Sequence, residues 1–249
     1  DLRKRWCSSD MIQDIWPKHL DNQYKNLKPG NEDTVFYFQG SSLLARPSGH
    51  FNSQNPEENV LIYPQYDEFV QGIKSSYGDK AVDNFEFIYL LSIDEEHFFL
   101  ARKTGSLERG TFLGEMADSA VHKDMYSFVR GYEFIGVDSF RKAQPREHAY
   151  AAITAFHLYG WYRDNHFCGR CGKPLKHDDK QRMLRCYCCK NMVFPKICPA
   201  VIVAVTDKDR ILLTKYAGRT YRNYALIAGF TEIGETTEET VSREVMEEV

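Results

Sequence analysis

Short apolar runs separated by polar turns fill the first half of the chain. Aromatic and β-branched residues gather in these runs, and Gly, Asn, Asp and Pro lie between them, a pattern typical of strands. Pro47–Gly49 predicts a turn, and Asp94–Glu96 predicts the tip of a hairpin. The expected strands are residues 35–38, 60–63, 85–91 and 98–101. The sequence therefore predicts a β-rich N-terminal domain over residues 11–141, interpreted as a packing or dimerisation domain.

A helical pattern follows this region. Pro145 stands at a tolerated first-turn position, and apolar residues recur at helical spacing up to Trp161. We expect a linking helix within residues 142–164.

The last fifty residues alternate strand and helix signals. The unbroken apolar run Ala200–Val205 predicts a strand covered on both faces. A polar turn at 207–209 then predicts a hairpin with residues 211–214, and residues 224–227 predict a third strand. Thr236 and Glu239 have the spacing of a capping box, which predicts a final helix. Its valines at 241, 245 and 249 repeat every four residues and predict a stripe that faces a core.

Composition places the chain among soluble globular proteins. Of its 249 residues, 43% are hydrophobic and 14% aromatic, which argues against disorder, and the net charge of −3 argues against a globally basic nucleic-acid binder. No run approaches the roughly 18 apolar residues of a membrane span, and no signal peptide is evident. We expect a cytoplasmic protein. We leave residues 1–10 out of the fold prediction, and because the chain stops inside the final helix, we expect a C-terminally truncated sequence.

Five of the seven cysteines fall between Cys168 and Cys189. Two C-x-x-C knuckles can present four thiolates to one tetrahedral zinc ion, and a shell of four thiolates leaves no position for a catalytic water. A structural zinc ribbon is therefore expected over residues 165–196, with free thiols or a redox pair as the alternative. Cys188 could replace Cys189, although Cys189 gives the preferred spacing. The expected ligands are Cys168, Cys171, Cys186 and Cys189.

The ribbon is also basic. Residues 163–196 contain nine Lys and Arg against three Asp. A solvated surface explains this excess, and attraction of a phosphate-bearing ligand is the functional alternative.

Acidic residues crowd the final helix. Residues 232–249 contain seven glutamates and one arginine. Glu244 and Glu248 are four residues apart and share a face, with Glu247 beside them. Mg²⁺ prefers clustered oxygen ligands, so this helix suits metal-assisted phosphoryl chemistry, whereas composition alone would favour a solvated acidic face.

The spacing of these residues resembles a known signature. Gly229, five residues, Glu235, seven residues and then Arg243-Glu244-Val245-Met246-Glu247-Glu248 resemble the Nudix box, G-x5-E-x7-R-E-U-x-E-E-x-G-U, in which U is aliphatic. With the ribbon upstream, and with residues 194–197, 199–205 and 228–230, the chain resembles the NADH pyrophosphatase (NudC-type) family of Nudix hydrolases. The resemblance implies an α+β fold with a β-rich N-terminal domain, a C4 zinc ribbon and the first part of an α/β/α Nudix sandwich over residues 197–249.

The resemblance also implies roles for single residues. In relatives Glu244 and Glu248 bind catalytic Mg²⁺ or Mn²⁺ with the backbone carbonyl at the Ala228 position, and Glu247 serves as a ligand or as the base for the attacking water. Arg243 and Glu235 would orient these carboxylates, and Gly229 would allow the turn. The remaining residues would contact substrate: Phe230, Phe194 (where a tyrosine is common), Gln181 and Arg141.

The activity implied is hydrolysis of the pyrophosphate bond of NAD(H) to nicotinamide mononucleotide and AMP, with NAD-capped RNA 5′ ends as a related substrate, by a homodimer. The sequence motif that distinguishes NAD(H) pyrophosphatases would lie beyond Val249. Two alternatives stay open: hydrolysis of another nucleoside diphosphate derivative such as ADP-ribose, and a non-catalytic zinc-ribbon or Nudix module that binds a ligand or nucleic acid.

Overall fold

The computed structural model describes residues 11–49, 60–104, 127–215, 217–218 and 223–249, with the side chains of residues 141 and 142 left out. The chain is α+β and divides into two compact units, Asp1–Pro195 and Lys196–Val249, which are described separately. Among the described residues, no helix has both the length and the apolar character that a membrane crossing requires.

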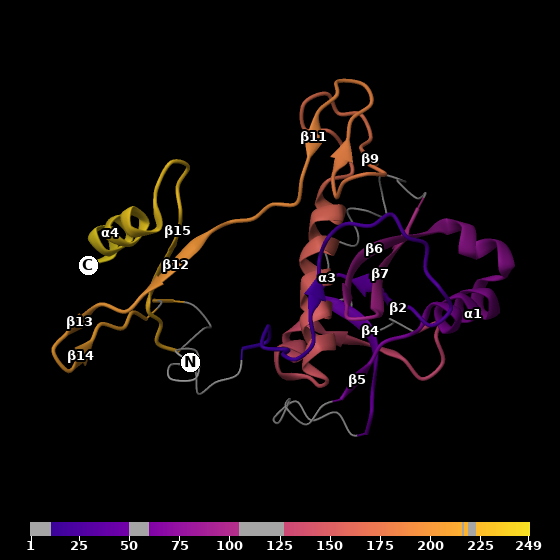
Figure 1. The fold of residues 1–249 in the computed structure, drawn as a ribbon, viewed down its shortest axis with the longest axis horizontal. Helices are drawn as coiled ribbons and strands as arrows, with labels where there is room; N and C mark the ends of the chain where they lie inside the picture. The colour runs from indigo at the N-terminus through magenta and orange to yellow at the C-terminus, as the bar shows by residue number, and fades with distance from the viewer. Residues whose placement is uncertain (1–10, 50–59, 105–126, 216, 219–222) are drawn as a thin grey trace. The chain divides into compact units, whose positions relative to one another are not determined.

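A four-stranded sheet lies at the centre of the first unit (Figure 1). Its order is β1-β6-β7-β2, and β2 runs parallel to β7. The turn between β6 and β7 contains Asp94, whose φ of 51° lies in the left-handed region, so the predicted hairpin tip is confirmed. The strands are β1 (Leu20–Asp21), β2 (Thr34–Phe36), β6 (Phe85–Ile93) and β7 (Glu96–Lys103).

A second sheet completes the β-rich part of this unit. Strand β4 pairs with β3, β5 and β8, all antiparallel. The sequence prediction did not include β4 as a strand. The elements are β3 (Phe38–Gln39), β4 (Ser42–Pro47), β5 (Leu61–Ile62) and β8 (Glu133–Gly136), with two 3₁₀ helices, η3 (Asp79–Asn84) and η4 (Val137–Lys142).

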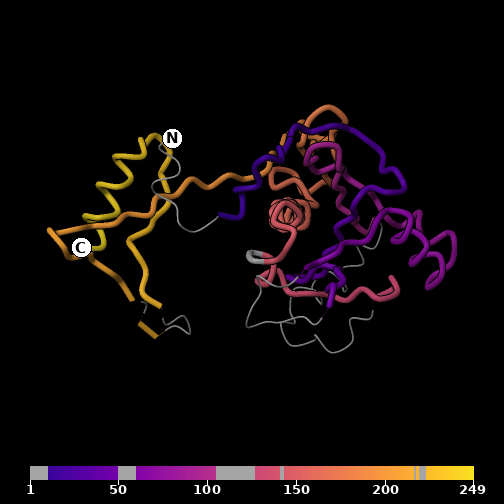
Figure 2. Tube along the Cα trace, turned by 60° about the horizontal axis from the view of Figure 1, so that its bottom comes forward, coloured from indigo at the N-terminus to yellow at the C-terminus, as the bar shows by residue number. Residues whose placement is uncertain are grey.

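Two hydrophobic clusters use opposite faces of the central sheet. Alternate residues of β6 and β7 belong to different clusters: Leu90 and Leu100 to one, Tyr89 and Phe99 to the other. This division follows from the two-residue period of a strand. Helix α3 (Arg146–Asp164) packs in the first cluster, and α1 (Tyr66–Tyr77) packs in the second. Figure 2 shows α3 nearly end-on beside these strands.

Helix α1 was not expected from the sequence. Phe69 and Ile73 are four residues apart and fully buried, as an amphipathic helix requires. Gly72 stands between them and lowers the helical preference of the segment. A Cβ on Gly72 would lie 2.8 Å from the carbonyl oxygen of Phe128, so glycine allows the close approach of this helix to the neighbouring segment.

The ribbon belongs to the first unit together with α3. It contains a three-stranded antiparallel sheet in the order β11-β10-β9, with β9 (Lys176–His177), β10 (Leu184–Arg185) and β11 (Met192–Val193). Leu184 packs in the same cluster as α3. Tyr162 of α3 lies with its hydroxyl oxygen 2.7 Å from Nε2 of His177, so this histidine is hydrogen-bonded, and burial lowers its pKa.

The second unit has two short β-pairs and one helix. Strand β12 (Ala200–Val203) pairs with β15 (Ile227–Phe230), and β13 (Thr206–Asp207) forms the expected hairpin with β14 (Arg210–Ile211). Helix α4 (Thr237–Glu248) packs on β12 and β15 and has the predicted capping box of Thr236 and Glu239.

Of two burial predictions for this unit, one is wrong and the other holds only in part. Strand β12 is not covered on both faces, because Ile202 is 74% exposed while Val201 is buried. Within the described part of the unit, α4 is the one helix that packs on this sheet. In α4 the buried residues are Thr240 and Glu244, and Val249 is 71% exposed. Val241 and Val245 are half-buried beside them, so the valine stripe is partly covered and is not the most buried part of the helix.

Candidate functional site

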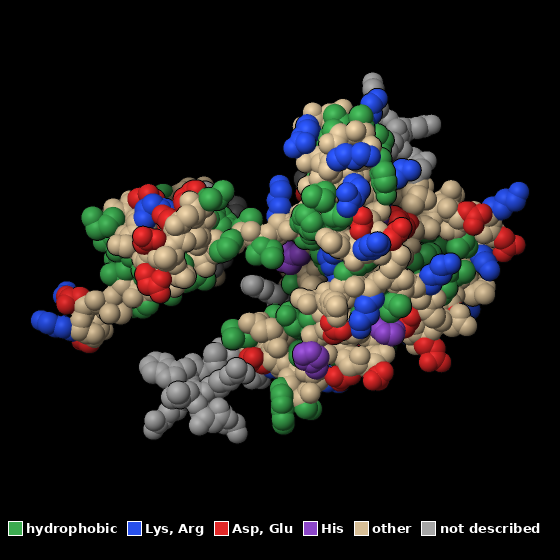
Figure 3. Space-filling model, turned by 45° about the horizontal axis from the view of Figure 1, so that its top comes forward, with side chains coloured by type: hydrophobic (Ala, Val, Ile, Leu, Met, Phe, Trp, Pro, Cys, Tyr) green, Lys and Arg blue, Asp and Glu red, His purple; other side chains and the backbone are tan. Residues whose placement is uncertain are grey.

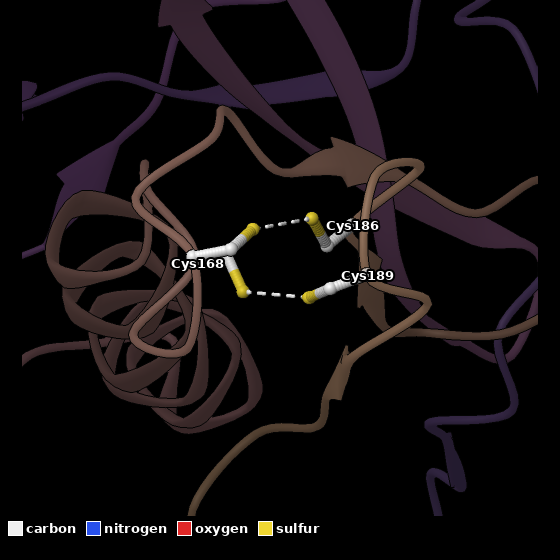
Figure 4. Close-up of side chains that lie close together, drawn as sticks. Cys168, Cys186 and Cys189 are labelled. Atoms are coloured by element: carbon white, nitrogen blue, oxygen red, sulfur yellow. Dashed lines mark hydrogen bonds between the residues drawn. The ribbon is translucent and has the colours of Figure 1, made fainter.

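The two cysteine knuckles face each other in the ribbon (Figure 4). The sulfur of Cys168 lies 3.5 Å from that of Cys189, and the sulfur of Cys171 lies 3.4 Å from that of Cys186. All four sulfurs lie within 4.8 Å of one another. Cys188 is exposed and is not part of this cluster, so the geometry favours Cys189 over Cys188.

This arrangement fits a tetrahedral metal ion. With metal–sulfur bonds of about 2.3 Å, the sulfurs of a tetrahedral zinc site lie about 3.8 Å apart, within the range that the four cysteines span. The backbone of the knuckles also favours the negatively charged thiolate form of the cysteines. Burial raises the pKa of the Cys168 thiol, but hydrogen bonds from the backbone at Arg170 and Cys171 and from neighbouring thiols lower it overall. The pKa of Cys186 is lowered as well, whereas that of Cys171 and Cys189 is raised. The four cysteines could therefore hold a metal ion.

A second polar cluster lies in the other unit and is centred on Glu235. Its carboxylate accepts hydrogen bonds from Arg243 (Nε, 2.6 Å; Nη2, 3.0 Å), the Thr240 hydroxyl (3.0 Å) and the backbone N–H of Glu232 (3.0 Å). The bond from Arg243 is the main reason that the pKa of Glu235 falls to about 2. Glu235 is therefore ionised at neutral pH. Its hydrogen bonds connect the loop before α4 to the helix.

Arg243 joins this loop to the acidic helix. Its Nη1 donates to Glu244 at 2.8 Å and reaches Glu247 at 3.3 Å, while its Nη2 donates to the backbone carbonyl of Phe230 at 2.9 Å. The paired carboxylates raise the pKa of Arg243 above its ordinary value, with Glu235 as the largest cause. One guanidinium thus orients two of the three glutamates that were expected to bind metal.

Gly229 has a role that the sequence prediction did not give it. It lies in strand β15, so the expectation that it allows a turn is wrong; Gly234, with φ 101°, occupies the turn before α4. A Cβ on Gly229 would lie 1.8 Å from Cδ of Glu244. Glycine is required here because the Glu244 carboxylate fills the space that a side chain would take. This contact explains how a glutamate that is only 8% exposed fits on the buried face of α4.

The expected glutamate metal site is not assembled as a ligand shell. Among the described residues, the cysteine cluster is the one group of three or more His, Cys, Asp or Glu side chains close enough to share an ion. Glu244 is buried and turned toward Arg243, whereas Glu247 and Glu248 are exposed. The carboxylates have the donor chemistry for a hard cation. Their joint binding of one ion stays a prediction.

The other expected residues are scattered over both units. Ala228 and Phe230 flank Gly229 on β15, and Phe230 is 67% exposed. In the first unit, Phe194 is 48% exposed and Gln181 lies in an exposed turn. Arg141 has its backbone in η4, but its side chain lies outside what the structure describes.

Thr240 was missed by the sequence analysis. It is fully buried, and its hydroxyl lies 3.0 Å both from Glu235 and from the backbone carbonyl of Thr236. The signal that could have found it is its position four residues after the capping threonine, on the helix face that also carries Glu244.

Comparison with known proteins agrees with these features. Residues 196–249 match the NUDIX domain family. The chain is 40% identical over 91 residues to proteins called "NAD-capped RNA hydrolase NudC" from Salmonella typhi and from Salmonella heidelberg (strain SL476). The match covers 36% of this chain and 35% of each relative, so the chain spans about a third of the length of these relatives. The second unit is therefore similar to a Nudix domain, and the 91 matched residues are similar to part of these NudC proteins.

Proposed function

We propose that the complete protein hydrolyses the pyrophosphate bond of NAD(H) with the help of Mg²⁺ or Mn²⁺, releasing nicotinamide mononucleotide and AMP, and that it acts in the same way on NAD-capped RNA 5′ ends. The names of the relatives support this class of substrate. The observation that carries the proposal is the buried carboxylate of Glu244 held between Gly229 and Arg243. A cytoplasmic location and a homodimer stay predictions from the sequence.

The Glu244 carboxylate is buried with Arg243 as its hydrogen-bond partner. A buried carboxylate is costly unless it is paired and hydrogen-bonded, and a longer side chain at position 229 would displace it. Apolar residues could fill the same space without that cost. The arrangement instead holds one carboxylate in a fixed position and leaves Glu247 and Glu248 exposed on the same turn of α4. A site that binds a cation needs such a preorganised oxygen ligand.

In the proposed mechanism, each residue of the cluster has a separate task. Glu244 and Glu248 would hold the cation with the carbonyl of Ala228, and Glu247 would bind it or take the proton of the attacking water. The cation, when bound, would neutralise charge that develops on the phosphate oxygens. Arg243 keeps Glu244 and Glu247 in position through its bonds of 2.8 and 3.3 Å. Glu235 in turn fixes Arg243 and offsets its charge.

We further propose that the cysteine cluster holds one structural zinc ion. Four thiolates complete a tetrahedral shell and leave no position for water, so the ion would stabilise the ribbon without taking part in hydrolysis.

The products of hydrolysis test the proposed function. The complete protein is expected to convert NAD(H) to nicotinamide mononucleotide and AMP in the presence of Mg²⁺ or Mn²⁺, as separated by liquid chromatography. ADP-ribose, assayed in parallel, should be cleaved with a lower kcat/KM. Preferred cleavage of ADP-ribose would replace the substrate that we propose. Absence of cleavage with either compound would contradict the reaction itself.

A further inference from the structure

The register of the ribbon sheet separates a buried row of side chains from an exposed row. Directly paired residues of neighbouring strands point to the same face, and the next residue along each strand points to the opposite face. One row contains Leu184, which is 2% exposed and packs in the core of the first unit. The other row therefore faces solvent. Its members, in register across β9, β10 and β11, are Lys176, Arg185 and Met192.

Large apolar side chains extend this exposed row. Met192 is 51% exposed, and Phe194, just beyond the end of β11, is 48% exposed. Tyr187 is 57% exposed, and Nζ of Lys176 lies 5.9 Å from the centre of its ring. We call Lys176, Arg185, Tyr187, Met192 and Phe194 together the ribbon face. It interleaves cations with exposed aromatic and thioether groups.

The charge around the ribbon face is positive. Arg185 is paired with Asp178, with 3.3 Å between Nε and Oδ2. In contrast, Lys176, Lys190 and Arg170 are exposed and have no carboxylate at ion-pair distance within the described part of the chain. Nζ of Lys190 donates to the backbone carbonyl of Tyr187 at 3.1 Å, so its charge lies beside the backbone of this residue. Figure 3 shows Lys and Arg side chains gathered with apolar groups over the end of the first unit that carries the ribbon.

We propose that the ribbon face binds single-stranded RNA, with bases stacked on Tyr187 and packed against Met192 and with phosphates held by Lys176 and Lys190. Exposed aromatic rings beside unpaired cations are the arrangement that proteins use for single strands, because every base has a face to stack and every nucleotide carries a charge. An acidic protein partner would pair with the cations but would leave the exposed ring faces without a stacking partner. That this strand is the body of a capped RNA rests on the proposed function.

Binding of uncapped RNA tests this site without any hydrolysis. The zinc-loaded chain of 249 residues is titrated into a fluorescent single-stranded 12-mer RNA over a series of salt concentrations, and anisotropy gives the dissociation constant. Replacement Tyr187→Ala should weaken binding by about tenfold, the effect of losing one stacked base. Lys176→Ala should lower the slope of log K against log salt by about 0.7, as expected for one lost phosphate contact on a single strand.

Matched variants on α1 and η3 serve as controls. Tyr77 is 63% exposed and Lys80 is exposed, and both lie outside the ribbon, so Tyr77→Ala and Lys80→Ala should leave affinity and salt slope unchanged. Because Tyr187 lies between two cysteines, zinc content is measured for each variant. Tyr187→Phe should keep both zinc and affinity. Met192→Ala, outside the knuckles, should weaken binding with zinc retained.

The outcomes separate this inference from the proposed function. Equal affinity of the ribbon-face variants and the wild type, or tighter binding of duplex than of single-stranded RNA, would overturn the inference even if the complete protein cleaves NAD(H). Conversely, weakened RNA binding by these variants would support the ribbon face even if the complete protein cleaves neither NAD(H) nor capped RNA.

Discussion

The Cys186→Ser variant is expected to lose zinc and the folded ribbon. Cys186 is fully buried, and its sulfur lies 3.4 Å from that of Cys171, so a serine hydroxyl would leave three thiolates and an incomplete tetrahedral shell. The three ribbon strands have only two residues each, too few for a sheet without another source of stability. Structural zinc in small peptides contributes about 10–16 kcal/mol of binding free energy. Its loss should therefore remove the thermal transition of the ribbon.

Cys188 provides the matched control for this variant. It lies in the same knuckle but is exposed and outside the cluster. Cys188→Ser should keep one zinc per chain, measured by atomic emission, and the wild-type thermal transition. Normal zinc content in Cys186→Ser, or loss of zinc in Cys188→Ser, would show that the cysteine assignment is wrong.

The Gly229→Ala variant should lose almost all hydrolytic activity in the complete protein. The added Cβ would lie 1.8 Å from Cδ of Glu244, so the carboxylate at the end of this side chain has to move. Either Glu244 leaves its position or α4 moves away from β15. Displacement of a reacting group by about 1 Å costs about a hundredfold in rate.

Gly136→Ala is the matched control for the added methyl group. A Cβ at Gly136 would meet no atom within 4 Å, and its φ of −61° suits alanine. This variant should retain the wild-type kcat and melting temperature. The melting temperature of Gly229→Ala distinguishes loss of a positioned carboxylate from loss of the fold. Wild-type activity in Gly229→Ala would show that the position of Glu244 does not matter.

The sequence predicted the features that depend on short local spacings. The knuckles, the capping box of Thr236 and the hairpin tip at Asp94 each involve residues a few positions apart, and the structure has all three elements where they were expected. Such patterns can be read from one chain because their geometry is set by the backbone over one turn.

Features that depend on contacts between distant segments could not be read in this way. Gly72 appeared to weaken a helix and Gly229 appeared to belong to a turn, yet each allows a close approach by a segment remote in the sequence. The valine stripe of α4 was a sound amphipathic pattern, but the structure buries Thr240 and Glu244 because Glu235 and Arg243 provide their hydrogen bonds. Polar groups can replace apolar ones in a buried position only when such partners exist.

The register of the ribbon sheet determines where the positive charges of the ribbon lie. Nine cations in residues 163–196 could have been spread evenly over a solvated surface. Pairing of β9, β10 and β11 instead places Lys176 and Met192 in one exposed row, while Arg185 in that row is neutralised by Asp178.

The most direct test of the account is whether the acidic turn of α4 binds a divalent cation that hydrolysis requires. Mn²⁺ binding by the zinc-loaded complete protein, followed by electron paramagnetic resonance together with NAD(H) turnover, is compared for the wild type, Glu248→Gln and Glu238→Gln. Glu238 is also exposed but lies in the first turn of α4. We predict that Glu248→Gln loses both Mn²⁺ binding and turnover while Glu238→Gln keeps both. Undiminished Mn²⁺ binding and turnover in Glu248→Gln would contradict the account.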